Sequence, residues 1–305
     1  MERKPVEKKI GFWSDFFYIY SMKIRKLGDR KPKVVLFQGS PRDKDTCSGM
    51  DSKTHSIIDF VVEKWSPFID FKVIDLAINL AKKPNIQPCK GCVSTSGGYH
   101  CHFQCSCYFK GDEKKPDLMK ELDVYTLLQE CDAFLVFSPI HWHSLSSQVK
   151  ALFDRLVCTN QTLTVEDAKK IMGEGNIKNP DITGKFARSG KHNNMLRNHL
   201  EGKVCGFYAH GDDGADDYEG KTMPESYNDV LIDNFSIDPK STVMPFVLQM
   251  KYSGVFVPDE LIQAFHMNKG IDYNTANKEL SRNAEPFDRA DLLMDSLMEY
   301  LDKKE

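Results

Sequence analysis

The chain has 305 residues, of which 41% are hydrophobic and 28% are charged, and its formal net charge is -3. This is the composition of a globular protein with enough apolar side chains for a sizeable core. A nucleic-acid-binding surface needs a strong basic excess, so the slightly negative charge argues against a nucleic-acid partner. No apolar stretch approaches the ~20 residues that a membrane-spanning helix needs, so we expect no membrane span.

Residues 1–30 are expected to be an extension of the main domain, which we place at 31–305. An aromatic and basic stretch at 10–26 is interrupted by an acidic residue, and no cleavage site follows it. This pattern argues against a secretory signal, so we expect a cytoplasmic protein. The stretch could lie on a membrane surface, but packing on a neighbouring subunit is the favoured interpretation.

Short runs rich in β-branched and aromatic residues predict the strands. Five such runs occur, at 33–37, 71–76, 133–137, 204–211 and 243–250. The last contains Pro245, which limits it to an edge or bulged position in a sheet.

Apolar residues recur at helical spacing between these runs. The predicted helices are 52–65, 117–131, 144–156 and 287–301. Ser52 or Asp51 can cap the first of them, and Ser144 the third. Strands that alternate with helices predict an α/β protein whose parallel sheet is covered on both faces. The polar segment 159–199 is expected to be a long excursion, and we assign no role to 220–285.

Ligands of such sheets bind beyond the carboxyl ends of the strands. In the loop after the first strand, Gly39 permits a tight turn, Ser40 offers a hydroxyl and Arg42 offers a cationic fork. A helix N-terminus follows, with Thr54 at its start, and this combination is typical of a phosphate site. A plain Gly-Ser-Pro turn with a solvated arginine is the alternative. The chain has no G-x-G-x-x-G fingerprint, which argues against a bound dinucleotide.

Five of the nine cysteines lie in a cysteine-rich segment, residues 89–107. They are Cys89, Cys92, Cys101, Cys105 and Cys107. Four thiolates can complete a tetrahedral zinc site or an iron-sulfur cluster, so four of these five are candidate ligands. The absence of any metal is the alternative. Of the isolated cysteines, three lie in apolar patterns and are expected in the core, while Cys47 is expected to be exposed. Those three are Cys131, Cys158 and Cys205.

Several blocks together resemble the NADPH-dependent FMN reductase group of flavodoxin-like proteins, which includes the iron-sulfur flavoproteins. The blocks are "LFQGSPR", "KTHSIIDF", "CKGC", "FLVFSPIHWHSLSSQVKALFDR" and "GKVCGFYAHGDDGA". The resemblance covers residues 33–217 and implies a flavodoxin-like, doubly wound, five-stranded parallel sheet. This chain would add an N-terminal extension and an enlarged C-terminal portion. The resemblance also implies a homodimer or higher homo-oligomer.

The resemblance assigns FMN-binding roles in three places. Ser40, Arg42 and Thr54 would hold the phosphate. The ring would lie against Pro139, Ile140, His141 and Trp142. His210, Gly211 and Asp212 would close its other side. Aromatic side chains and backbone amides suit a planar heterocycle with a polar edge, and no catalytic acid or base is implied, because the redox chemistry belongs to FMN.

The cysteine-rich segment departs from the iron-sulfur flavoprotein pattern. Thr95 stands where that group has its third cysteine. A 4Fe-4S cluster would therefore need Cys101 or Cys105 as a substitute ligand.

Three functions remain open at this point. The favoured one is an FMN-dependent NAD(P)H oxidoreductase that reduces a quinone, a free flavin or another small acceptor. The second is an iron-sulfur flavoprotein that carries electrons between ferredoxin and an acceptor. The third is a non-enzymatic interaction module stabilised by flavin or zinc.

Overall fold

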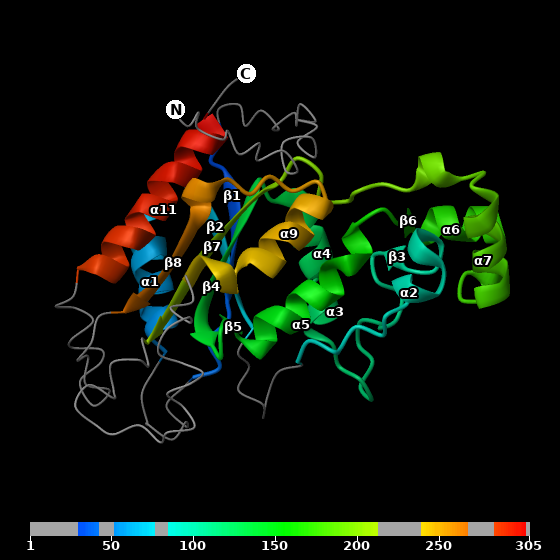
Figure 1. The fold of residues 1–305 in the computed structure, drawn as a ribbon, viewed down its shortest axis with the longest axis horizontal. Helices are drawn as coiled ribbons and strands as arrows, with labels where there is room; N and C mark the ends of the chain where they lie inside the picture. The colour runs from blue at the N-terminus through cyan, green and yellow to red at the C-terminus, as the bar shows by residue number, and fades with distance from the viewer. Residues whose placement is uncertain (1–29, 43–51, 77–84, 213–238, 268–283, 303–305) are drawn as a thin grey trace, which may run out of the picture.

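The computed structural model describes residues 30–42, 52–76, 85–212, 239–267 and 284–302 (Figure 1). Its parallel strands are β1 (Lys33–Gln38), β2 (Asp70–Asp75), β4 (Ala133–His141), β7 (Val204–Asp212) and β8 (Ile262–Met267). They lie in the order β2-β1-β4-β7-β8. Numbered along the chain, this is the order 2-1-3-4-5, which is that of flavodoxin-like sheets. The predicted fold class is therefore confirmed.

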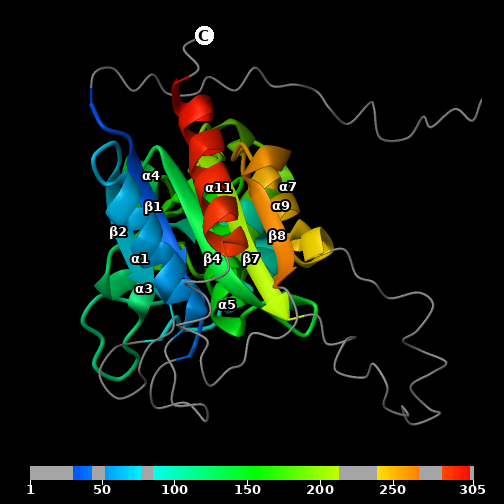
Figure 2. The same cartoon turned by 90° about the vertical axis from the view of Figure 1, so that its left-hand side faces the viewer.

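Helices cover both faces of the sheet (Figure 2). On one face lie α1 (Lys53–Trp65) and α11 (Glu285–Asp302). On the other lie α3 (Leu118–Glu121), α4 (Val124–Glu130), α5 (Ser147–Leu156) and α9 (Met244–Tyr252). The sheet is the centre of the core because its middle strands are buried on both faces, and Ala133 to Phe137 are all at most 1% exposed.

Two capping predictions had different outcomes. Ser52 caps α1 as expected, because its side chain accepts a hydrogen bond from His55 N. The prediction that Ser144 caps α5 is wrong. Ser144 instead pairs with His141, where β4 folds back antiparallel onto β5 (Ser144–Leu145). The N-cap is Ser146, whose Oγ accepts from Val149 N at 3.4 Å.

The predicted strand at 243–250 is wrong, because this segment is α9. Pro245 lies in the first turn of α9, where a missing N–H leaves no helical hydrogen bond unmade. The fifth strand is β8, further along the chain. The predicted helix at 117–131 is broken between α3 and α4, where Asp123 adopts the left-handed conformation with φ 50°.

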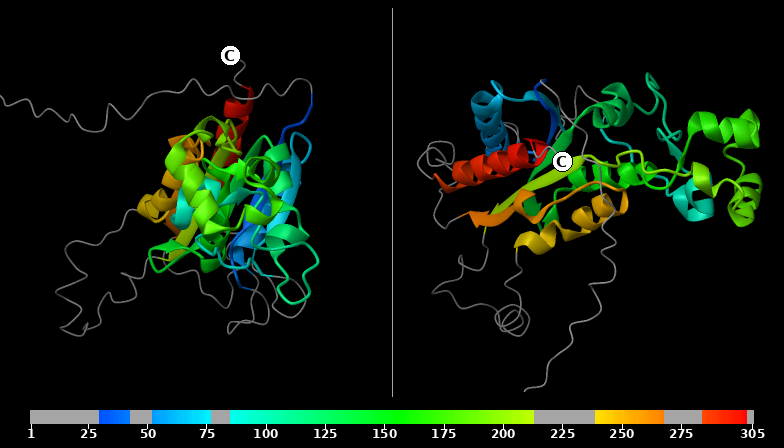
Figure 3. Two further views of the ribbon diagram at one scale, coloured as in Figure 1. Left: turned by 90° about the vertical axis from the view of Figure 1, so that its right-hand side faces the viewer. Right: turned by 90° about the horizontal axis from the view of Figure 1, so that it is seen from above.

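The segment 159–199 contains regular secondary structure. It contributes β6 (Leu163–Thr164), α6 (Val165–Met172) and α7 (Pro180–Ser189), which pack with α2 (Val93–Ser96) and β3 (His102–Phe103) of the cysteine-rich segment. A small apolar cluster joins the two segments, and β3 pairs parallel with β6. The unit extends from one end of the sheet domain (Figure 3).

Short 3-10 turns complete the described elements. They are Gly97–Tyr99, Val157–Thr159, Glu174–Asn176, Asn193–Met195, Pro239–Thr242 and Asp259–Leu261. Within the described parts of the chain, no helix has the length and apolar character needed to span a bilayer. The N-terminal extension up to residue 29 and Cys47 lie outside the described residues.

Candidate functional site

Hydrogen bonds tie together the loops at the carboxyl edge of the sheet. Gly39 N donates to Phe137 O at 2.8 Å, and Ser146 Oγ donates to Gly39 O at 2.5 Å. These bonds join the loop after β1 to β4 and to the start of α5. Position 39 requires glycine, since a Cβ there would overlap the side chain of Val149. On the other side of β4, Pro139 is in register with His210 of β7.

The predicted phosphate-binding residues lie together. Ser40 is 5% exposed, and its Oγ accepts a hydrogen bond from Arg42 N at 3.3 Å. Thr54, in the first turn of α1, is hydrogen-bonded through Oγ1 to His210 Nε2 at 2.9 Å. This contact joins the start of α1 to the end of β7, which are separated by 156 residues. Side chains from two of the predicted loops therefore meet at one point.

Charges at this edge favour an anion. Burial, together with the charges of Lys53 and His141, lowers the pKa of His210 to about 3. Burial and the charge of Arg42 lower the pKa of His141. Both imidazoles are therefore kept neutral beside the basic side chains of Arg42 and Lys53.

Lys53 is the residue that sequence reasoning missed. It is the first residue of α1 and only 8% exposed, and its charge helps to lower the pKa of His210. The sequence did carry a signal for Lys53, because it is a basic residue directly before Thr54 in the helix that follows a candidate phosphate loop. With Arg42 it gives the edge two positive charges beside hydroxyl groups and helical amides, a donor set suited to a phosphate dianion.

The β4–β5 hairpin carries the predicted ring-binding residues. Its two-residue turn is formed by Trp142 and His143, with φ 48° and 62°. Such turns normally use Asn and Gly, because both positions have positive φ. The Trp142 side chain is 96% exposed at the tip. Below the tip, Ile140 packs closely against Gly211 of β7. A side chain at position 211 would place its Cβ only 3.0 Å from the Cβ of Ile140.

The structure brings most of the predicted residues to this one edge. Hydrogen bonds or charge interactions join five of them there, namely Ser40, Arg42, Thr54, His141 and His210. The strands β4 and β7 also carry Pro139, Ile140 and Gly211 at this edge, and Trp142 lies at the hairpin tip. Asp212 ends β7, and its side chain lies outside the described part of the structure.

The cysteine-rich segment lies at the other end of α5. Cys92 Sγ and Cys107 Sγ are 3.1 Å apart, and Cys107 is also hydrogen-bonded to Cys105. Cys101 and Cys105 are buried, while Cys89 is partly exposed. The described residues include all five of these cysteines, and among them no group of three or more His, Cys, Asp or Glu side chains is arranged to hold a metal ion. This arrangement does not fit the predicted cluster or zinc site. Cys131, Cys158 and Cys205 are buried, as predicted.

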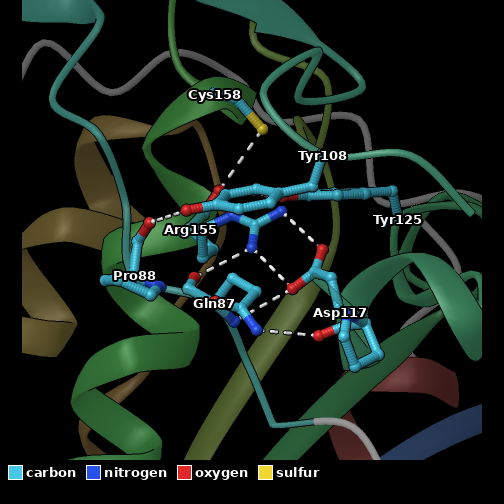
Figure 4. A network of polar contacts seen from close by, with 8 residues as sticks. Gln87, Pro88, Tyr108, Asp117, Tyr125, Arg155 and Cys158 are labelled. Carbon is cyan, nitrogen blue, oxygen red and sulfur yellow. Dashed lines mark hydrogen bonds and ion pairs between the residues drawn. The ribbon is translucent and has the colours of Figure 1, made fainter. Parts of the chain in front are cut away.

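A buried ion pair fixes the cysteine-rich segment on α5 (Figure 4). Arg155 is 1% exposed and donates from both terminal nitrogens to Asp117, at 2.7 and 2.9 Å. The same guanidinium donates to Gln87 O at 2.9 Å and lies 4.6 Å from the centre of the Tyr108 ring. The Tyr108 hydroxyl in turn donates to Pro88 O at 2.8 Å. Sequence reasoning placed only apolar residues on this helix face and missed the pair.

The strand order defines a flavodoxin-like α/β protein whose loops converge at the carboxyl edge of its sheet. Residues 32–172 match the family model described as NADPH-dependent FMN reductase. The family resemblance expected from the sequence is confirmed over those residues. No curated protein sequence matches the chain significantly.

Several solved structures are similar to the chain at low identity. RosB with bound 8-demethyl-8-formylriboflavin-5'-phosphate is 11% identical, with TM-score 0.48, over 86% of this chain and 75% of that one. The apo form of the NADH:FMN oxidoreductase EMOB is 13% identical, with TM-score 0.41, over 90% and 92%. General stress protein 14 from Treponema denticola, in complex with FMN, is 13% identical, with TM-score 0.40, over 88% and 98%.

Proposed function

We propose that this chain binds FMN at the carboxyl edge of the sheet and catalyses electron transfer from NADH or NADPH to a small acceptor, such as a quinone or a free flavin. The observation that carries the proposal is the meeting of Ser40, Arg42, Thr54 and His210 beside Lys53. All of these except His210 lie within residues 32–172, which match the FMN reductase family model. When bound, FMN would supply hydride and single-electron chemistry.

The phosphate is assigned to the start of α1. Arg42 and Lys53 would offset its charge, while Ser40 and Thr54 would donate hydroxyl hydrogen bonds. Because His210 is hydrogen-bonded to Thr54, it would hold that hydroxyl in place. Its lowered pKa keeps the imidazole neutral, so it adds no charge that varies near neutral pH.

The ring is assigned to the hairpin. Ile140 and Gly211 would form an apolar floor, and Trp142 would present its indole to the ring from the exposed tip. The unusual Trp-His turn supports this role, because backbone strain of this kind persists mainly where a site uses it.

Reduction of the bound flavin tests the proposed activity. Protein purified without oxygen and loaded with FMN should be yellow, lose its flavin bands when NADPH or NADH is added, and regain them with a quinone. A brown protein with a broad shoulder that dithionite bleaches would instead support an iron-sulfur carrier. If neither nicotinamide reduces the flavin-loaded protein, the proposed activity is wrong.

A double variant of the hairpin turn, Trp142→Asn with His143→Gly, should show two opposite effects. Relief of positive φ should raise the free energy of unfolding of the flavin-free protein by about 1–3 kcal/mol. Loss of the aromatic contact should weaken FMN binding by about 0.5–1.5 kcal/mol. Urea unfolding and flavin-fluorescence titration measure the two quantities.

The matched control for the turn variant is Gln161→Asn, which relieves another left-handed residue outside the three loops. It should raise stability without changing FMN affinity. If the turn variant binds FMN as well as the unmodified chain does, the ring does not lie against Trp142.

The finer predictions belong to this proposal. The chain would consist of an extension at 1–30 and a domain at 31–305. It would form a homodimer or higher homo-oligomer, and it would be cytoplasmic. Ferredoxin as a partner belongs to the iron-sulfur alternative, which the cysteine arrangement does not favour.

A further inference from the structure

The thiols of Cys92 and Cys107 form a close pair that the proposed flavin site does not use. Their sulfur atoms are 3.1 Å apart, and both residues are only partly buried. A disulfide bond holds sulfur atoms about 2.0 Å apart, so linking the two would need a movement of about 1 Å.

The pair is held in place by contacts that involve neither thiol. Tyr108, which directly follows Cys107, donates to Pro88 O at 2.8 Å. Arg155 contacts both chain segments, because it donates to Gln87 O at 2.9 Å and lies 4.6 Å from the Tyr108 ring (Figure 4). The chain shortly before Cys92 and the chain just after Cys107 are thus fixed to one buried side chain. Such preorganisation favours intramolecular bond formation, since little freedom remains to be lost.

Cys105 is a poorer partner for Cys107 than Cys92 is. Cys105 also contacts Cys107, but it is only 8% exposed, and a single residue separates the two, so their disulfide would close a small ring. Cys92 and Cys107 are fifteen residues apart, which leaves a loop long enough to close without such a constraint.

We propose that Cys92 and Cys107 are a reversible dithiol/disulfide couple that reacts with small external disulfides of the glutathione type. One thiolate attacks a sulfur of the external disulfide, which forms a mixed disulfide and releases one small thiol. The other thiolate then attacks the protein sulfur of the mixed disulfide and releases the second small thiol. The pair loses two electrons and two protons, and the external disulfide is reduced to two thiols. This couple does not require FMN to be bound.

The first test counts thiols in the full-length, unmodified protein. After incubation with excess glutathione disulfide and acid quenching, two of the nine thiols should be lost to an internal bond, counted as titratable thiols lost beyond the glutathione adducts that mass spectrometry finds. Mass spectrometry of a non-reduced digest should find the peptides of Cys92 and Cys107 joined, and dithiothreitol should restore all nine thiols. This mapping needs no variant, so it stands even where a substitution impairs folding.

Single substitutions then identify the pair. Cys92→Ser and Cys107→Ser should each stop at a mixed disulfide with glutathione, whereas the matched control Cys89→Ser should still lose two thiols to an internal bond. A joined pair that includes Cys105, or no thiol loss at all, would overturn the proposal. So would iron or zinc held by these thiols in protein purified without oxygen, as measured by metal analysis.

Discussion

Replacing Asp117 with asparagine is expected to lower the free energy of unfolding by about 3–5 kcal/mol. The carboxylate is 0% exposed and accepts two hydrogen bonds from Arg155, which is 1% exposed. Asparagine keeps the volume of the side chain but removes its charge, so the guanidinium would be left buried without a counterion. Urea unfolding followed by tryptophan fluorescence measures the effect.

The matched control is an exposed ion pair on the same protein. Lys169 and Glu174 are paired with 41% and 80% of their side chains exposed, so solvent screens the pair and Glu174→Gln should leave the free energy of unfolding nearly unchanged. A double variant, Asp117→Leu with Arg155→Met, should regain much of the stability that the single variant loses, because no unpaired charge remains. A loss of less than about 1 kcal/mol in Asp117→Asn would show that the pair does not hold this region together.

Removing either cation at the start of α1 is expected to weaken FMN binding. Arg42→Ala and Lys53→Met should each cost about 1.5–3 kcal/mol of charge-assisted phosphate contact, which is roughly a 10- to 100-fold increase in Kd. The affinity for riboflavin, which lacks the phosphate, should stay nearly unchanged. Flavin-fluorescence titration with both ligands separates a phosphate contact from a general disturbance of the site.

Arg188→Ala serves as the control for lost positive charge. Arg188 is exposed on α7, in the unit beyond the sheet, so its removal should change neither affinity. If Arg42→Ala and Lys53→Met weaken FMN and riboflavin equally, the phosphate is bound elsewhere.

The middle strands of the sheet were predictable because they are buried on both faces and appear as continuous apolar runs. The fifth strand was not, since 243–250 is the more apolar run and forms α9, while β8 is a mixed segment, "IQAFHM". Pro245 was the cue, because proline suits the first turn of a helix better than a strand. The local pattern of apolar residues cannot decide which of the two segments forms the fifth strand, because both bury apolar side chains.

The loops at the carboxyl edge were predictable because the position of a ligand site follows from the topology of a parallel sheet. Lys53 and the Arg155–Asp117 pair were not found for different reasons. Lys53 carries a local signal that a search for phosphate contacts could use. The ion pair joins residues 38 positions apart, and a charged residue on an apolar helix face does not reveal its partner.

The central claim is that the loops after β1, β4 and β7 bind one FMN, with its phosphate at the start of α1. Titrating the unmodified chain with FMN and with riboflavin, and following the quenching of flavin fluorescence, tests this most directly. We predict one FMN per chain and a riboflavin affinity lower by roughly 100-fold or more, as expected when several charge-assisted phosphate contacts are missing. Equal affinity for the two flavins, or no binding of FMN, would contradict the account.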